Sequence, residues 1–312
     1  MATSSVHDPL SSLKSSTDRI IDPDPLIGSD RGWLPLFGPL VSFLILVAVA
    51  WQLRSLDLKS IAALVPPNPL FWIAFAAYYL VGPLSEWVIF RRLWRLPIEG
   101  VGALLRKLVS NEILLGYLGE VYFYAWARRN AHVTTAPFGA IKDVTILSAL
   151  TGNVVALIMV VLTAPLFGSL HLGMDSKAFV GSTAFILLLS AVMLVLRKRL
   201  FTLPRRELWF AAGAHLARIA ATIVLAAVMW HLLLPAVAVT WWLVLGTVRQ
   251  LVSRLPFLPN KDVVFAGIAT FLVGSDTEIV SAMALMATLL LGAHLVVGAM
   301  LGIGELARET RA

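Results

Sequence analysis

The sequence contains no cysteine, which excludes disulfide bonds, thiol catalysis and cysteine-ligated metal clusters. It also has no His and Glu spacing typical of zinc enzymes, no Gly-x-Ser-x-Gly elbow and no glycine-rich phosphate loop. Charge is scarce, because only 14% of the residues are Asp, Glu, Lys or Arg. These absences disfavour metalloenzymes, hydrolases and nucleotide-dependent enzymes. We therefore expect no enzyme activity, no catalytic residue, no metal and no cofactor.

Apolar residues dominate instead. They make up 59% of the 312 residues, and the mean hydropathy is +0.85. Several apolar runs approach or exceed the roughly 20 residues that an α-helix needs to cross a bilayer. The pattern predicts an all-α polytopic membrane protein with about six transmembrane helices. The predicted helices are Leu36–Leu53, Pro69–Phe90, Phe138–Leu166, Phe179–Leu196, Leu208–Leu234 and Ile279–Ile303.

The formal net charge is +7 and the sequence pI is near 10, a balance also found in nucleic-acid-binding proteins. Here the basic residues lie in short loops between apolar runs, with ten of them in the loops 91–95, 128–129 and 197–206. The excess of Lys and Arg in cytoplasmic loops explains this distribution, so we expect no nucleic-acid partner. It places these three loops and both termini in the cytoplasm.

Two apolar segments are interrupted by polar residues, Leu104–Arg129 and Val239–Gly274. The first has basic residues at both ends, as expected of a segment that enters the membrane and returns to the same face. With this assignment the second segment enters and returns on the outer side. Such re-entrant segments survive in a bilayer only where their polar groups face protein or a wet cavity.

The order of elements repeats. A long run, a broken segment and a long run occur twice, and the second set follows the first by about 135 to 141 residues. Two such units inserted from opposite faces would form an inverted repeat. In that architecture the binding site lies where the two broken segments meet, near the middle of the membrane.

Charged residues at membrane depth are the candidate site residues, because each costs about 2.5–3.5 kcal/mol to insert. Glu112 and Glu120 lie in the first broken segment, and Arg249 and Arg254 in the second; Arg218 lies within the fifth long run. Two interpretations stay open. The charges pair with one another and hold helices together, or they line a substrate path in which arginine binds an anion.

Other polar residues have structural interpretations. We expect Arg249 to pair with Glu112 or Glu120, Glu86 to pair locally with Arg91, and Lys142 to pair with Asp143. A single intramembrane histidine is more often a hydrogen-bonding packing residue than a metal ligand, and we expect this role for His294.

Three places resemble one known family. They are EWVIFRRLWRLP after the second run, Leu115-Gly116-Tyr117-Leu118-Gly119-Glu120 in the first break, and Arg254-Leu255-Pro256-Phe257-Leu258-Pro259 in the second. Together with the order of elements, they resemble the lysylphosphatidylglycerol synthase transmembrane region family of flippase-like proteins. The chain looks like a divergent member, because Asn260-Lys261-Asp262 replaces the glycines of the family's second break.

The resemblance covers roughly residues 36–305 and implies a flippase-like transmembrane domain, which we place at residues 33–305. The polar composition of residues 1–32 predicts a disordered tail, and the charge distribution places it and a short tail at 306–312 in the cytoplasm. The resemblance also implies a multi-pass protein of the bacterial inner membrane that handles an anionic lipid or lipid-linked head group. Its partner would be that lipid substrate; a membrane partner protein or a homo-oligomer stays open. The alternatives are a membrane enzyme acting on a lipid-linked substrate and a non-transporting membrane subunit.

Overall fold

The computed structural model describes residues 66–114, 118–130, 137–169, 201–254, 260–273 and 277–309, and all regular structure in these ranges is α-helical. Four helices are long and apolar enough to cross a membrane: α4 (Pro69–Trp94), α7 (Pro137–Ser169), α10 (Arg205–Leu233) and α13 (Thr277–Glu309). They match four of the six predicted spans. The other two, 36–53 and 179–196, lie outside the described residues, as does the tail 1–32. Helix α13 continues into the range predicted as the C-terminal tail.

Local signals in the sequence fix the ends of α4. The side chain of Asn68 accepts a hydrogen bond from the Leu70 N–H, and Pro69 occupies the first helical position. At the other end Arg95 adopts a left-handed conformation, with φ of 53°, and terminates the helix. Inside α4, Pro83 has no N–H, so the carbonyl of Tyr79 loses its usual intrahelical partner. The helix is therefore weakened at its centre.

Both predicted broken segments are pairs of short helices. The first contains α5 (Gly100–Ile113) and α6 (Leu118–Asn130), and the second contains α11 (Val239–Ser253) and α12 (Lys261–Val273). The two helices of each pair pack against each other. Gly119 permits the close approach of α6 to α5, because a Cβ there would collide with the carbonyl of Lys107. None of the four is among the helices of membrane-spanning length.

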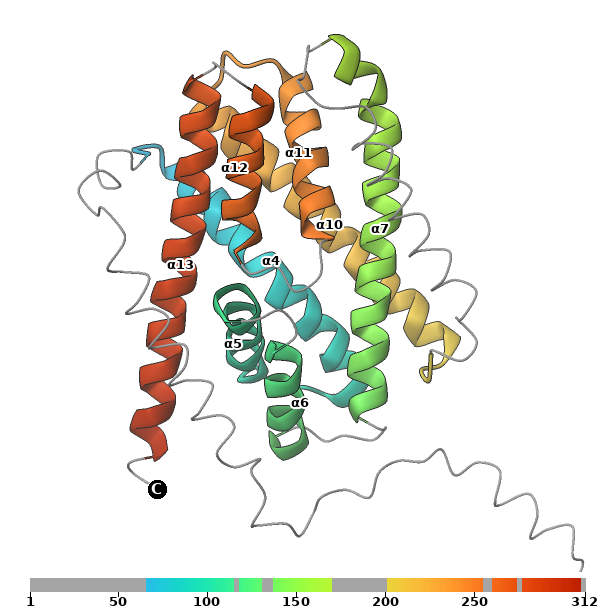
Figure 1. The fold of residues 1–312 in the computed structure, drawn as a ribbon. Helices are drawn as coiled ribbons and strands as arrows, with labels where there is room; N and C mark the ends of the chain where they lie inside the picture. The colour runs from blue at the N-terminus through green and yellow to red at the C-terminus, as the bar shows by residue number, and fades with distance from the viewer. Residues whose placement is uncertain are drawn as a thin grey trace, which may run out of the picture.

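The helices of the first set, α4 to α7, and those of the second set, α10 to α13, make matching contacts. Helix α5 packs against α13, as α11 packs against α7; the pairs α4–α5 and α6–α7 correspond likewise to α10–α11 and α12–α13. Helices α4 and α10, the first of each set, contact each other. Figure 1 shows α7 and α13 on opposite sides, α5 and α6 in the lower half, and α11 and α12 in the upper half. The contact pattern is therefore two-fold in part, because the contact of α7 with α10 has no strong counterpart between α13 and α4.

Two apolar clusters form the described core. One joins α4 to α10, α11, α12 and α13 around Trp230, Trp242 and Met283. The other joins α4 to α5, α6 and α7 around Phe90 and Phe123. On α4 the first cluster uses residues 71–79 and the second residues 89–94. The central stretch of α4, which contains Pro83, lies between the two clusters.

The outer surface of the described part is strongly apolar. Long aliphatic side chains on the span-length helices are well exposed, among them Ile73, Val161, Leu162, Val224 and Met300. A soluble monomer rarely leaves so many large apolar side chains uncovered. Together with the four span-length helices, this surface is compatible with an integral membrane protein.

Candidate functional site

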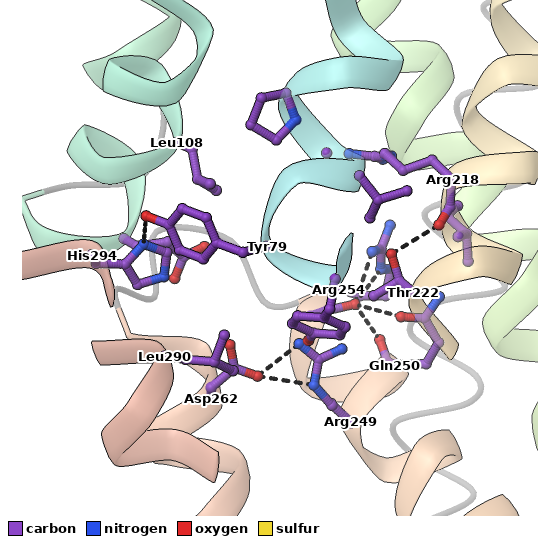
Figure 2. Close-up of a pocket in the computed structure, with 17 residues that line it drawn as sticks. Tyr79, Leu108, Arg218, Thr222, Arg249, Gln250, Arg254, Asp262, Leu290 and His294 are labelled. Carbon is purple, nitrogen blue, oxygen red and sulfur yellow. Dashed lines mark hydrogen bonds and ion pairs between the residues drawn. The ribbon is translucent and has the colours of Figure 1, made fainter. Parts of the chain in front are cut away.

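A cavity of about 190 Å³ lies at the centre of the described helices, lined by residues of α4, α5, α10, α11, α12 and α13. Its charged lining consists of three arginines and two carboxylates: Arg218, Arg249, Arg254, Glu112 and Asp262. Figure 2 shows Arg218 and Arg254 on one side and the Tyr79–His294 pair on the other. The lining therefore offers both polar groups and the aromatic and aliphatic surface of α4 and α13.

Four of the five candidate residues predicted from the sequence line this cavity: Glu112, Arg218, Arg249 and Arg254. The fifth, Glu120, does not. Its carboxylate accepts a hydrogen bond from Asn111 Nδ2 at 3.0 Å and lies 3.5 Å from Lys107 Nζ. Because α6 packs closely on α5 at Gly119, the next residue is directed toward α5 rather than into the cavity.

Glu112 lies where the two broken segments meet. Its backbone carbonyl accepts a hydrogen bond of 3.0 Å from the N–H of Asn260, the residue before α12. Asn260 has a positive φ of 49°, a conformation that asparagine tolerates better than most residues. The first break is therefore joined to the start of α12 by main-chain atoms. Burial, and then the negative charge of Asp262, raise the pKa of Glu112 above its usual range.

Arg249 pairs with Asp262 and not with a glutamate of the first break. Its guanidinium approaches Asp262 Oδ1 at 2.7 Å and 2.9 Å, through Nη2 and Nε. The expected pairing with Glu112 or Glu120 was wrong, because α11 and α12 fold back on each other and bring the Arg and Asp together. The guanidinium also lies 5.1 Å from the ring centre of Tyr78, at cation–π distance.

Arg218 enters the cavity from α10. Its Nη2 donates to Ser148 Oγ of α7 at 2.8 Å, and its buried Nε has no hydrogen-bond partner in the described ranges. No described carboxylate lies within 4.0 Å of it, so the expected pairing of Arg218 is not observed among the residues that the structure describes. A buried guanidinium that lacks such a partner can accept an anionic ligand.

Arg254 is fixed against α7. Its guanidinium donates to Ser253 Oγ at 2.8 and 3.0 Å and lies so close to Gly152 that a Cβ there would overlap it. Only glycine at position 152 leaves room for the guanidinium in this position. Gly152 is therefore a positioning residue for Arg254 that the sequence reasoning missed.

A second buried charge network supports the cavity from α5. Lys107 Nζ lies 2.7 Å from Glu86 of α4 and 3.5 Å from Glu120 of α6. The expected local pair between Glu86 and Arg91 was wrong. Arg91 lies instead over the ring of Trp87, at 4.8 Å from its centre. One lysine thus connects three helices that the sequence does not place together.

The other two structural expectations are confirmed. Lys142 Nζ lies 3.4 Å from Asp143, although Asp143 chiefly accepts hydrogen bonds from the backbone of Thr202 and Leu203 before α10. His294 Nδ1 lies 3.1 Å from the hydroxyl oxygen of Tyr79. Tyr79 and His294 also line the cavity, so His294 is a packing residue that faces the site.

Tyr78, Tyr79 and Asp262 are the functional candidates that sequence reasoning missed. The tyrosines precede Pro83 by about one turn of α4, and a polar-tipped aromatic pair beside a proline kink was a signal for a cavity wall. Asp262 was considered only as part of the Asn260-Lys261-Asp262 sequence in the second break. Its position, in the first turn of α12, indicated a charge near the second break.

Within the described ranges, no group of three His, Asp or Glu side chains could hold a metal ion. Comparison with known proteins gives no match: no family model fits the chain, and no curated protein and no solved structure is similar to it.

Proposed function

We propose that this chain is a flippase-like integral membrane protein that binds the anionic head group of a lipid or lipid-linked molecule in the central cavity and moves it across the bilayer. Its location would be the bacterial inner membrane, with both termini in the cytoplasm. The observation that carries the proposal is the cavity itself. Three arginines from two helices face two carboxylates at the point where the two broken segments meet.

The charges favour an anionic ligand. Arginine binds phosphate and carboxylate groups through its planar fork, and in the described ranges Asp262 forms an ion pair with Arg249. Arg218 presents a buried Nε without a partner in the described ranges. A head group near Arg218 would supply the missing acceptor, while its acyl chains remained against the apolar outer surface of the helices.

The arrangement of the helices supports movement across the membrane. The partly two-fold contact pattern fits the inverted repeat expected from the sequence, in which one unit rocks against the other around a fixed central site. Pro83 lies in the cavity wall and weakens α4 at the same level, which favours bending there.

Purified protein in phosphatidylcholine vesicles tests the proposal. The vesicles contain a trace of phosphatidylglycerol with a fluorescent acyl chain, and a membrane-impermeant quencher reports its movement between leaflets. Wild type should accelerate the movement. Arg218→Gln should abolish it, whereas Arg206→Gln, which changes an exposed arginine at the start of α10, should not.

Movement no faster than in protein-free vesicles, together with no binding of the anionic lipid, would overturn the proposal. Binding without movement would favour the alternative of a non-transporting membrane subunit.

A further inference from the structure

The two carboxylates of the cavity differ in their partners. Asp262 forms an ion pair with the Arg249 guanidinium, whose Nη2 and Nε both approach Asp262 Oδ1. Glu112 has no Lys or Arg side chain within ion-pair distance in the described part of the chain. The charge of Lys261 acts on Glu112, but its Nζ donates to the carbonyl of Ser253 at 3.2 Å and forms no ion pair with the glutamate. Glu112 is therefore a carboxylate in a polar cavity that no described cation neutralises directly.

The surroundings of Glu112 leave its protonation state balanced. The positive charge of Lys261, and then a hydrogen bond from its backbone at the N-terminus of α12, favour the charged form. Burial and the charge of Asp262 favour the neutral form. The other titratable or charged groups around it come from five helices and one helix cap: Tyr78 and Tyr79 of α4, Arg218 of α10, Arg249 of α11, Arg254 at the C-terminal cap of α11, Lys261 and Asp262 of α12, and His294 of α13.

An anion bound by the arginines would share this cavity with the Glu112 carboxylate. Two negative charges in one partly buried space repel each other, and the carboxylate relieves the repulsion by taking up a proton. We propose that binding of the anionic head group drives Glu112 to take up a proton from water wherever the empty site leaves this carboxylate ionised, so that the site holds the anion and a proton together. This inference rests on the proposed function and adds the coupling ion to it.

The sign of the pH dependence follows from linkage. Anion binding raises the proton affinity of Glu112, so protonation of Glu112 equally raises the affinity for the anion. Two pKa values of Glu112 bound the effect: a higher one in the anion-bound site and a lower one in the empty site. As the pH falls from the higher to the lower value, the affinity for the anion should increase. One coupled proton gives at most about a tenfold gain in affinity per pH unit. Below the lower pKa the affinity should become constant.

Calorimetry tests the coupling with full-length protein in phosphatidylcholine nanodiscs. The probe is short-chain phosphatidylglycerol, whose phosphodiester stays ionised throughout the measured range of about pH 5 to about pH 9. Repeating the titration in buffers with different ionisation enthalpies gives the number of protons taken up per probe. Wild type should take up as much as one proton and bind more tightly as the pH falls. Short-chain phosphatidylcholine controls for binding through the acyl chains alone.

Variants assign the proton to a residue. At every pH, Glu112→Gln should bind the probe with the affinity that wild type has at low pH. Its binding should not depend on pH and should take up no proton. Glu120→Gln removes a carboxylate outside the cavity, and Glu99→Gln removes an exposed one at the start of α5; both should keep the wild-type profile.

Binding of the probe by wild type with no proton uptake at any pH in the measured range would overturn the inference alone, whether or not Glu112→Gln folds. Loss of the pH dependence in Glu120→Gln, with its retention in Glu112→Gln, would also overturn it. Absence of binding at every pH would overturn the proposed function and the inference together.

Discussion

The N–H of Asn260 donates to the carbonyl oxygen of Glu112 across 3.0 Å, which joins the second broken segment to the first. The sequence-based expectation that the two breaks meet is therefore correct. The contact consists of this hydrogen bond and of one from the Lys261 backbone to the Glu112 carboxylate, and not of the predicted ion pairs. The cavity opens beside this hydrogen bond, and both Glu112 and Asp262 face it. The ion pairs of Lys107 in the first set of helices and of Arg249 in the second then orient the charged side chains.

The first prediction concerns the Arg249–Asp262 pair. Arg249→Ala leaves Asp262 without its cation in a partly buried site, which should lower the free energy of unfolding by about 3 kcal/mol. Arg205→Ala, in the exposed first turn of α10, should change it by less than about 0.5 kcal/mol. Thermal unfolding in detergent measures both. The double variant with Asp262→Ala should lose less than the sum of the two single losses. Equal melting temperatures for Arg249→Ala and Arg205→Ala would show that the pair contributes nothing.

The second prediction concerns Lys107, which holds Glu86 and Glu120 together. Lys107→Met removes the buried cation that contacts two part-buried carboxylates in the described ranges and should cost about 3 kcal/mol of stability. Adding Glu86→Gln should recover part of the loss, because one of the unpaired charges is then removed. The comparison is made by thermal unfolding of the single and double variants. A double variant that is less stable than Lys107→Met would contradict the network.

The third prediction compares two glycines that approach other elements closely. In Gly152→Ala the added Cβ meets the end of the flexible Arg254 side chain, which can move, so stability should fall by about 1 kcal/mol or less. In Gly119→Ala the Cβ meets the Lys107 carbonyl, which cannot move without the helix, and the cost should be about 1–3 kcal/mol. Melting temperatures measure the difference. Gly102→Ala is the control, because its Cβ meets no atom within 4 Å.

Gly152→Ala also tests Arg254 in ligand binding. Displacing the guanidinium should weaken binding of short-chain phosphatidylglycerol by about tenfold, equivalent to about 1.4 kcal/mol. Unchanged affinity in a folded Gly152→Ala variant would show that Arg254 does not contact the head group.

The fourth prediction concerns orientation in the membrane. Helix α10 runs from Arg205 to Leu233, so single cysteines at Arg206 and Ala236 should react with impermeant maleimide from opposite faces. The basic flank predicts that Arg206→Cys is labelled from the cytoplasm. The chain has no native cysteine, so the unmodified protein gives the background. Labelling of both positions from one side would contradict the predicted topology.

The sequence by itself determined where the helices are and where they break. The starts of α4, α7, α10 and α13 agree with the runs of apolar residues, and the breaks fall within the two polar-interrupted segments. The physical reason is that insertion into a bilayer depends on the summed transfer free energy of consecutive residues, which is a local property. Asn68 and Pro69 likewise mark the start of α4 through contacts within one turn.

Only the tertiary structure decided which charges meet. Glu112 and Glu120 lie in the same broken segment, yet one lines the cavity and the other joins Lys107 and Asn111. Arg249 could have paired with either glutamate, but the packing of α11 against α12 gives it Asp262. The rotation and close approach of packed helices, set by contacts such as Gly119 against Lys107, determine which side chains share a face. That information is non-local, and hydropathy does not contain it.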